Sequence, residues 1–80
     1  MFMEDSPLKI IWLKHCVKDF KNLKEEEFIR VYAKLKEILP NLIQNTSRVE
    51  GTQLRRLRIG GKRLFLRIYE NNVICVGYKI

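Results

Sequence analysis

The spacing of apolar residues changes along this chain, and each change marks an expected element of structure. Residues 8–13 (LKIIWL) are a short β-branched and aromatic run bounded by polar residues. The run is too short for a helix and is apolar on both faces, so it predicts a strand inside a sheet. Residues 14–23 then take up a helical period. One stripe of this short amphipathic helix contains Cys16, Val17, Phe20 and Leu23.

A second, longer helix is expected from residue 25 to about Pro40, or through Ile43 as a short turn. Asn22 followed by Glu25 resembles a capping box with Asn as the N-cap. Glu25–Glu27 then form a solvated helix start, where carboxylates favour the helix dipole. The apolar positions recur at heptad-like spacing: Phe28, Tyr32, Leu35 and Leu39, flanked by Ile29 and Ile38. Residues 44–51 are polar and predict a loop.

The last third of the chain alternates with the period of two that strands require. Strands are expected at residues 53–59, 62–69 and 73–79, with tight turns at Gly60–Gly61 and Asn71–Asn72. One face is apolar and is expected to be covered by the helices: Leu57, Leu64, Leu66, Ile68, Ile74 and Val76. The opposite face gathers charges and one aromatic ring: Arg56, Arg58, Arg63, Phe65, Arg67 and Lys79.

The order β-α-α-β-β-β predicts an α+β domain in which two helices pack on one face of a small, mainly antiparallel sheet. The 80 residues suffice for one domain, so residues 1–80 are expected to be a single unit. The core of so short a chain is thin. A partner chain or a homodimer contact is therefore expected.

The positive charge of the chain is concentrated in its strand-rich part. The net charge is +7, and residues 48–80 hold eight Lys and Arg but two Asp and Glu. This distribution indicates a sheet face that meets a polyanion. Nucleic acid, an acidic protein and an anionic membrane all fit the charge. The simplest alternative is an exposed sheet that Lys and Arg merely keep soluble.

Several classes of function are excluded by what the sequence lacks. No apolar run reaches the roughly 20 residues that span a bilayer, and the start lacks the basic region of a signal peptide, so no membrane partner is expected. Cys16 and Cys75 lack CxxC spacing and are expected to be buried thiols in a reducing cytoplasm. With two Cys and one His, neither a metal site nor a cofactor is expected. His15 is expected to be a surface or capping residue, and Trp12 a buried one.

Arginines interleaved with an aromatic ring are typical of an RNA-binding surface. Arg pairs bidentately with phosphate, and an exposed Phe offers a surface to an unstacked base. RNA cleavage can be built from the same set, because attack of the 2′-hydroxyl on its neighbouring phosphate needs a base, an acid and positive charge. Lys and Arg supply that charge.

At these residues the chain resembles the RelE/ParE toxin superfamily. The resemblance is carried by the element order, by Glu50–Gly51, by residues 57–66 (LRIGGKRLFL) and by residues 76–79 (VGYK), and it covers Lys9 to Lys79. It implies a RelE-like toxin of a toxin–antitoxin system. Such a toxin is a ribosome-dependent mRNA endoribonuclease that inhibits translation in the cytoplasm, and a cognate antitoxin protein neutralises it.

The resemblance also implies roles for single residues. Arg63 matches the arginine that binds the scissile phosphate, and Lys79 falls where an arginine stabilises the transition state or leaving group. Arg56 and Arg58 fall where basic residues precede the turn, one of them aiding deprotonation of the 2′-hydroxyl. These four are the catalytic candidates. The candidates for RNA binding alone are Arg55, Lys62, Phe65 and Arg67.

The sequence departs from the RelE pattern after Lys79. Many RelE-type enzymes carry a tyrosine or histidine a few residues beyond that point, where this sequence has only Ile80. Tyr78 is expected to point toward the helices, so the acid is missing or comes from another residue. The alternatives left open are a gyrase inhibitor of ParE type, a catalytically impaired relic, and a nucleic-acid-binding accessory protein.

Overall fold

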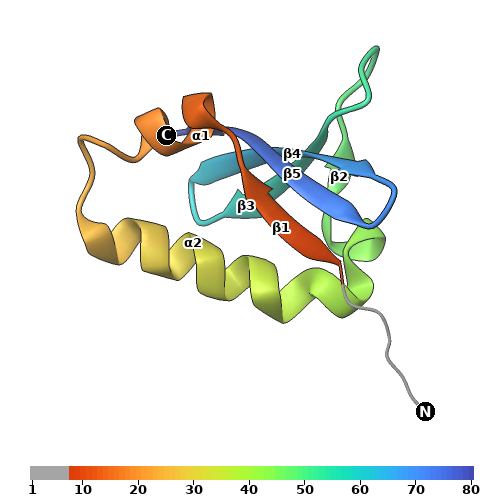
Figure 1. The fold of residues 1–80 in the computed structure, drawn as a ribbon, viewed down its shortest axis with the longest axis horizontal. Coiled ribbons are helices and arrows are strands. Elements are labelled where there is room, and N and C mark those ends of the chain that lie inside the picture. The colour runs from red at the N-terminus through yellow and green to blue at the C-terminus, as the bar shows by residue number, and fades with distance from the viewer. Residues whose placement is uncertain (1–7) are drawn as a thin grey trace.

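A computed structural model describes residues 8–80, which form one five-stranded sheet with a long helix along one face (Figure 1). The strands are β1 (Lys9–Trp12), β2 (Ser47–Arg48), β3 (Arg55–Ile59), β4 (Lys62–Tyr69) and β5 (Asn72–Lys79). Their order across the sheet is β1-β5-β4-β3-β2, with β1 parallel to β5 and the other neighbours antiparallel. Ser6–Pro7, which the sequence predicts to be a break before the first strand, lies outside the described residues.

The helices follow β1 in the chain. They are α1 (Lys14–Asp19) and α2 (Glu25–Ile38), and the short 3-10 turns η1 (Leu39–Asn41) and η2 (Ile43–Asn45) extend the second helix. Figure 1 shows α2 lying across one face of the sheet, while α1 lies beside the C-terminal end of β5. The expected α+β fold is confirmed, as is the continuation of the second helix beyond Pro40.

One hydrophobic cluster fills the space between α2 and the sheet. Its buried members are Cys16, Phe20, Val31, Leu35, Ile38, Leu42, Leu57, Leu64, Leu66, Val73, Cys75 and Tyr78. Burying each large apolar side chain contributes about 1.5–3 kcal/mol, so this cluster supplies most of the driving force for folding. Trp12 is only partly buried and packs on Phe28, with 4.8 Å between the ring centroids.

Both cysteines are free and buried, as predicted. Burial raises the pKa of the Cys16 thiol to about 11, with the Asp19 carboxylate adding to the effect. Burial likewise raises the pKa of Cys75 to about 12. Both thiols therefore stay protonated at neutral pH, which leaves them without nucleophilic character.

The predicted N-cap and apolar stripe of α2 are wrong in detail. Lys24, not Asn22, is the N-cap, and no side chain within residues 8–80 caps the helix. The buried positions are Glu27, Val31, Leu35 and Ile38, whereas Tyr32 and Ile29 are exposed. The core-facing stripe is rotated because Glu27 turns inward, where its carboxylate finds partners on the sheet.

The first strand is at the edge of the sheet, so its expected interior position is wrong. β1 pairs with β5 alone, and no other strand among residues 8–80 adjoins it. Only one of its two apolar faces is part of the core. Ile10 and Trp12 pack against the core, whereas Ile11 on the other face is exposed. The loop expected at residues 44–51 contains two short elements, η2 and β2, that the sequence pattern missed.

The turn between β3 and β4 forms at Gly60–Gly61 as expected, with Gly60 at a positive φ of 65° that glycine adopts without strain. The next turn is one residue earlier than predicted. Tyr69 pairs with Asn72, so the turn consists of Glu70 and Asn71, and Glu70 has a φ of 55°.

A bulge in β5 changes which side chains face the core. The register shifts between the Phe65–Gly77 and Leu66–Cys75 pairs, which leaves Val76 as an extra residue. Cys75 therefore faces α2, and the expected core positions of Ile74 and Val76 are wrong. Because Val76 is an extra residue, the alternation of buried and exposed side chains shifts by one residue beyond the bulge. Tyr78 is therefore buried and Lys79 is exposed.

Candidate nucleic-acid interface

Three cations stand in one row on the open face of the sheet, the face opposite α2. Arg58 pairs with Arg63 across β3 and β4, and Arg63 pairs with Lys79 across β4 and β5. All three side chains are exposed. The neighbouring row carries Arg56 opposite Phe65. Because paired residues lie only about 4.5–5.5 Å apart at Cβ, the structure brings the four catalytic candidates together beside Phe65.

No carboxylate of the sheet neutralises this open face. The five strands contain no Asp or Glu, and both ion pairs within residues 8–80 involve Glu27 on the helix side. The Nε atom of Arg56 is buried and has no hydrogen-bond partner among the described residues. Since an unpaired buried donor is costly, an oxyanion ligand at this row would be stabilised by Arg56 as well as by the exposed cations.

Two of the predicted RNA-binding residues lie away from the open face. Arg55 faces the helix side, where its Nε donates to Thr46 Oγ1 at 2.7 Å and its Nη2 donates to the Ile43 and Thr46 carbonyls at 3.1 Å. Lys62 also faces the helix side and binds Glu27. Arg55 thus fastens η2 to the sheet, and Lys62 fastens the hairpin to α2.

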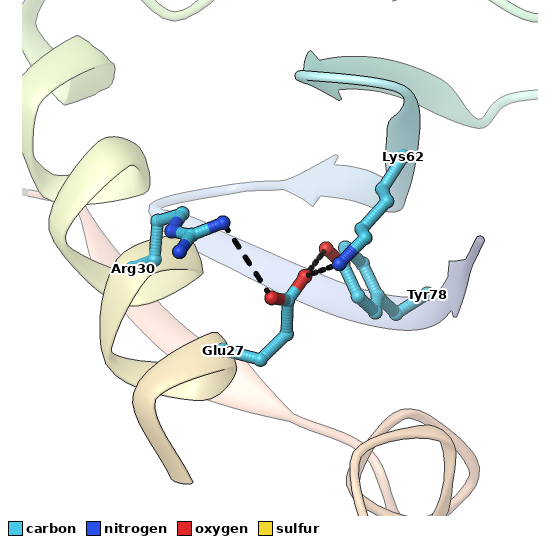
Figure 2. A network of polar contacts seen from close by, with 4 residues as sticks. All are labelled: Glu27, Arg30, Lys62 and Tyr78. Atoms are coloured by element: carbon cyan, nitrogen blue, oxygen red, sulfur yellow. Dashed lines mark hydrogen bonds and ion pairs between the residues drawn. The ribbon is translucent and has the colours of Figure 1, made fainter. Parts of the chain in front are cut away.

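Glu27 is the centre of a polar network that joins α2 to the hairpin and the last strand (Figure 2). Lys62 Nζ donates to its Oε2 at 2.7 Å, the Tyr78 hydroxyl donates to the same oxygen, and Arg30 Nη1 lies 3.7 Å from Oε1. The expected solvated Glu27 is therefore wrong.

These contacts also set the protonation of both partners. Hydrogen bonds from Lys62 and Tyr78 hold the pKa of Glu27 below its ordinary value. Burial, together with the Glu27 carboxylate, raises the pKa of the Tyr78 hydroxyl. Tyr78 points toward the helices, as its strand position predicted, and its hydroxyl donates its hydrogen bond to Glu27. It cannot act as an acid on the open face.

Helix α1 lies over the exposed edge of β5 and brings a histidine to the open face. The backbone N–H of Tyr78 donates to Asp19 Oδ2 at 2.8 Å, beyond the point where β1 stops pairing with β5. A shallow hollow of about 500 Å³ follows this junction. Its lining residues are His15, Lys18, Asp19, Leu54, Phe65, Val76, Gly77 and Lys79. The sequence did not connect His15 with the basic strands, because nothing in its local pattern reveals the parallel pairing of β1 and β5.

A second hollow of about 500 Å³ opens at the other end of β4 and contains Arg67. The Arg67 guanidinium lies over the ring of Tyr69, 5.6 Å from its centroid, and Arg48 and Gln53 share the lining. Arg67 is thus exposed on the open face but separate from the row of three cations. Tyr69 is a further exposed aromatic ring on this face. The period-two alternation of β4 places it on the same face as Phe65, so the sequence contained the information needed to find it.

The described part of the chain contains neither a group of side chains that could bind a metal ion nor a helix that could span a membrane. Within residues 8–80, no three His, Cys, Asp or Glu side chains gather as metal ligands. No helix in the same range is long and apolar enough to cross a bilayer.

Three solved structures share the arrangement of the sheet and helices. The chain superposes with a TM-score of 0.73 on a chain of the RelBE2 toxin–antitoxin complex of Mycobacterium tuberculosis, at 15% identity, over 92% of this chain and 98% of that one. For the intact RelBE toxin–antitoxin complex of E. coli the TM-score is 0.71 at 16% identity, over 90% and 94%. This chain has a RelE-like fold. The RelB–RelE antitoxin–toxin complex of Methanococcus jannaschii gives a TM-score of 0.66 at 19% identity, over 85% and 86%.

The RelE-like fold is evident from the structure and not from the sequence comparisons. Neither protein-family models nor curated protein sequences match the chain. Identities of 15–19% leave the roles of individual residues to be argued from their geometry.

Proposed function

We propose that this chain is the toxin of a toxin–antitoxin pair and that it acts as a ribosome-dependent mRNA endoribonuclease in the cytoplasm. One observation carries the proposal: Arg58, Arg63 and Lys79 form a row on the open face of a RelE-like sheet, and no carboxylate within residues 8–80 forms an ion pair with them. A row of like charges is unfavourable by itself, so an anionic ligand is its natural complement.

The chemistry follows from the positions in this row. Arg63 is in the middle and binds the scissile phosphate, and Lys79 stabilises charge on its far side. Arg58 and Arg56 lie on the other side, where they favour the deprotonated 2′-oxygen that attacks the phosphorus. Preorganised cations stabilise the phosphorane more than the substrate, because negative charge accumulates there in the transition state. Phe65, in the row of Arg56, offers its ring to a neighbouring base.

This chain offers a suitable surface for an antitoxin on the side of α1 opposite the hollow that contains His15. An apolar groove of about 880 Å³ is lined by residues of the α1 and α2 region: Trp12, Lys14, Val17, Lys18, Phe20, Lys21, Glu25 and Phe28. Aromatic rings with three lysines complement an apolar partner segment that carries acidic side chains. We propose that the antitoxin occupies this groove.

The test uses purified ribosomes programmed with a defined message whose 3′ fragments are mapped by primer extension. Addition of the protein is expected to produce discrete cuts in the message on the ribosome and none in the free message. Intact message at protein levels that arrest growth would overturn the nuclease proposal. Growth arrest with DNA damage and uncut message would instead support inhibition of gyrase.

A further inference from the structure

The face of α1 that meets β5 carries the only histidine of the chain. His15 and Asp19 are one helical turn apart and therefore lie on the same side of α1. Asp19 is fixed against β5, since its Oδ2 accepts the Tyr78 N–H and lies 3.4 Å from the position that a Cβ at Gly77 would occupy. This contact turns the same side of α1, and His15 with it, toward the open face.

The adjacent side of α1 is buried, which holds the helix in this orientation. Cys16 is fully buried, and Phe20 stacks on Tyr78 with 4.6 Å between ring centroids. Because Cys16 and Phe20 anchor α1 on the core side, the helix cannot rotate to withdraw His15 from the hollow that it shares with Phe65 and Lys79.

Within residues 8–80, the open face otherwise lacks a group that exchanges a proton near neutral pH. Arginine and lysine are ordinarily cations there, and the strands contain no carboxylate. Tyr78 points inward to Glu27. Tyr69 is on the open face, but it lies six residues along β4 from Arg63, about 20 Å at the rise of a strand. Imidazole is the side chain suited to proton transfer at neutral pH.

We propose that His15 is the general acid of the RNA cleavage described above, an inference that rests on the proposed function. As the 2′-oxygen bonds to phosphorus, the bond from phosphorus to the 5′-oxygen breaks and its electron pair stays on that oxygen. The imidazolium of His15 donates a proton to the departing 5′-oxygen, while the 2′-hydroxyl proton passes to water. The products are a 2′,3′-cyclic phosphate and a 5′-hydroxyl. The charged groups that share the hollow with His15 are Lys18 and Asp19 of α1 and Lys79 of β5.

The direct test compares wild type with His15→Asn in single-turnover cleavage on programmed ribosomes. His15 is exposed, so the variant is expected to fold normally, with Lys36→Ala as a control for an exposed change on α2. Loss of the acid is expected to slow cleavage about 100-fold or more. The fall in wild-type rate as pH rises should disappear in the variant, and added imidazole should restore part of the activity of His15→Ala.

A modified message separates proton donation from a structural role. Sulfur in place of the bridging 5′-oxygen at the mapped cut makes a leaving group that needs no proton. On this message His15→Asn should cleave as fast as wild type. A variant that is equally slow on both messages, or that matches wild type on the normal one, would overturn the role of His15 and leave the nuclease intact. If wild type cuts neither message, the nuclease proposal itself fails, and the role of His15 with it.

Discussion

Arg63 of β4 lies directly opposite Lys79 of β5, with both side chains exposed on the face that α2 leaves uncovered. Like charges opposite each other destabilise a sheet. Arg63→Ala is therefore expected to raise the free energy of unfolding by about 0.2–1 kcal/mol at low salt. The gain should shrink as salt screens the pair. Urea unfolding at two salt concentrations measures this.

The matched control is Arg67→Ala on the same strand and face, where the β5 partner is the uncharged Ile74. Its stability should not depend on salt in this way. An Arg63→Ala protein that is less stable than wild type at low salt would mean that the pair is not repulsive. The row would then need no anionic ligand.

The bulge in β5 accommodates Val76 as an extra residue, so that Tyr78 is buried and Lys79 is exposed. Deleting Val76 is expected to remove the bulge and keep these sides, because Gly77 still pairs with Phe65 and Lys79 with Arg63. Inserting an alanine after Gly77 is expected instead to exchange the sides of Tyr78 and Lys79 and to push Lys79 toward the core. The insertion should therefore cost far more stability than the deletion, for which a loss of about 1 kcal/mol is expected. Urea unfolding and the near-ultraviolet circular dichroism of the aromatic residues measure both variants. Equal stability of the two variants would show that the strand tolerates either register.

The Glu27 network predicts a dependence of stability on pH. The pKa of Glu27 is held below its ordinary value by Lys62 and Tyr78, so its contribution is complete above the pKa of the unfolded chain and is lost as pH falls through the lower folded value. Stability should therefore drop in acid, and Glu27→Gln should be weaker at neutral pH with a smaller acid-induced change. Urea unfolding at pH 7 and pH 3 measures the difference, with Glu26→Gln as the exposed control. If Glu27→Gln loses as much stability between pH 7 and pH 3 as the wild type, another group causes the loss of stability in acid.

Arg55 and Arg58 are on the same strand but are expected to have different roles: Arg58 binds RNA, whereas Arg55 stabilises the fold. Arg58→Ala should reduce the slope of log affinity against log salt for single-stranded RNA by about 0.7, the value for one phosphate contact. Arg55→Ala should keep the slope, and should lower stability by about 1–3 kcal/mol because its hydrogen bonds to Thr46 and Ile43 are lost. Fluorescence titrations and urea unfolding measure these effects. A reduced slope for Arg55→Ala would place the RNA on the helix side.

The sequence predicted the elements of the fold better than their pairing. Alternation in β4 and the Gly60–Gly61 turn fixed the central hairpin, and with it the positions of Arg56, Arg58 and Arg63. Strand alternation cannot reveal a bulge, so Ile74 and Val76 were placed on the wrong face, while Lys79 was placed correctly. Charge alone did not separate Arg55 and Lys62 from the open-face cations, although strand alternation places them on the same face as Leu57 and Leu64.

Two further features depend on tertiary contacts that no local pattern contains. Glu27 looked like a solvated first-turn residue, since Lys62 and Tyr78 meet it only in the folded chain. His15 looked remote from the basic strands for the same reason. The parallel pairing of β1 with β5 places α1 at the end of β5 and so moves His15 to the margin of the candidate site.

The measurement that tests the central claim most directly is the rate at which Arg63→Ala cuts a message bound to programmed ribosomes. Removing one preorganised donor at the phosphate is expected to slow cleavage about 100-fold or more. Lys36→Ala on the outer side of α2 removes the same charge and should cut at the wild-type rate. If Arg63→Ala also cuts at the wild-type rate, the open face of the sheet is not where this protein binds the scissile phosphate.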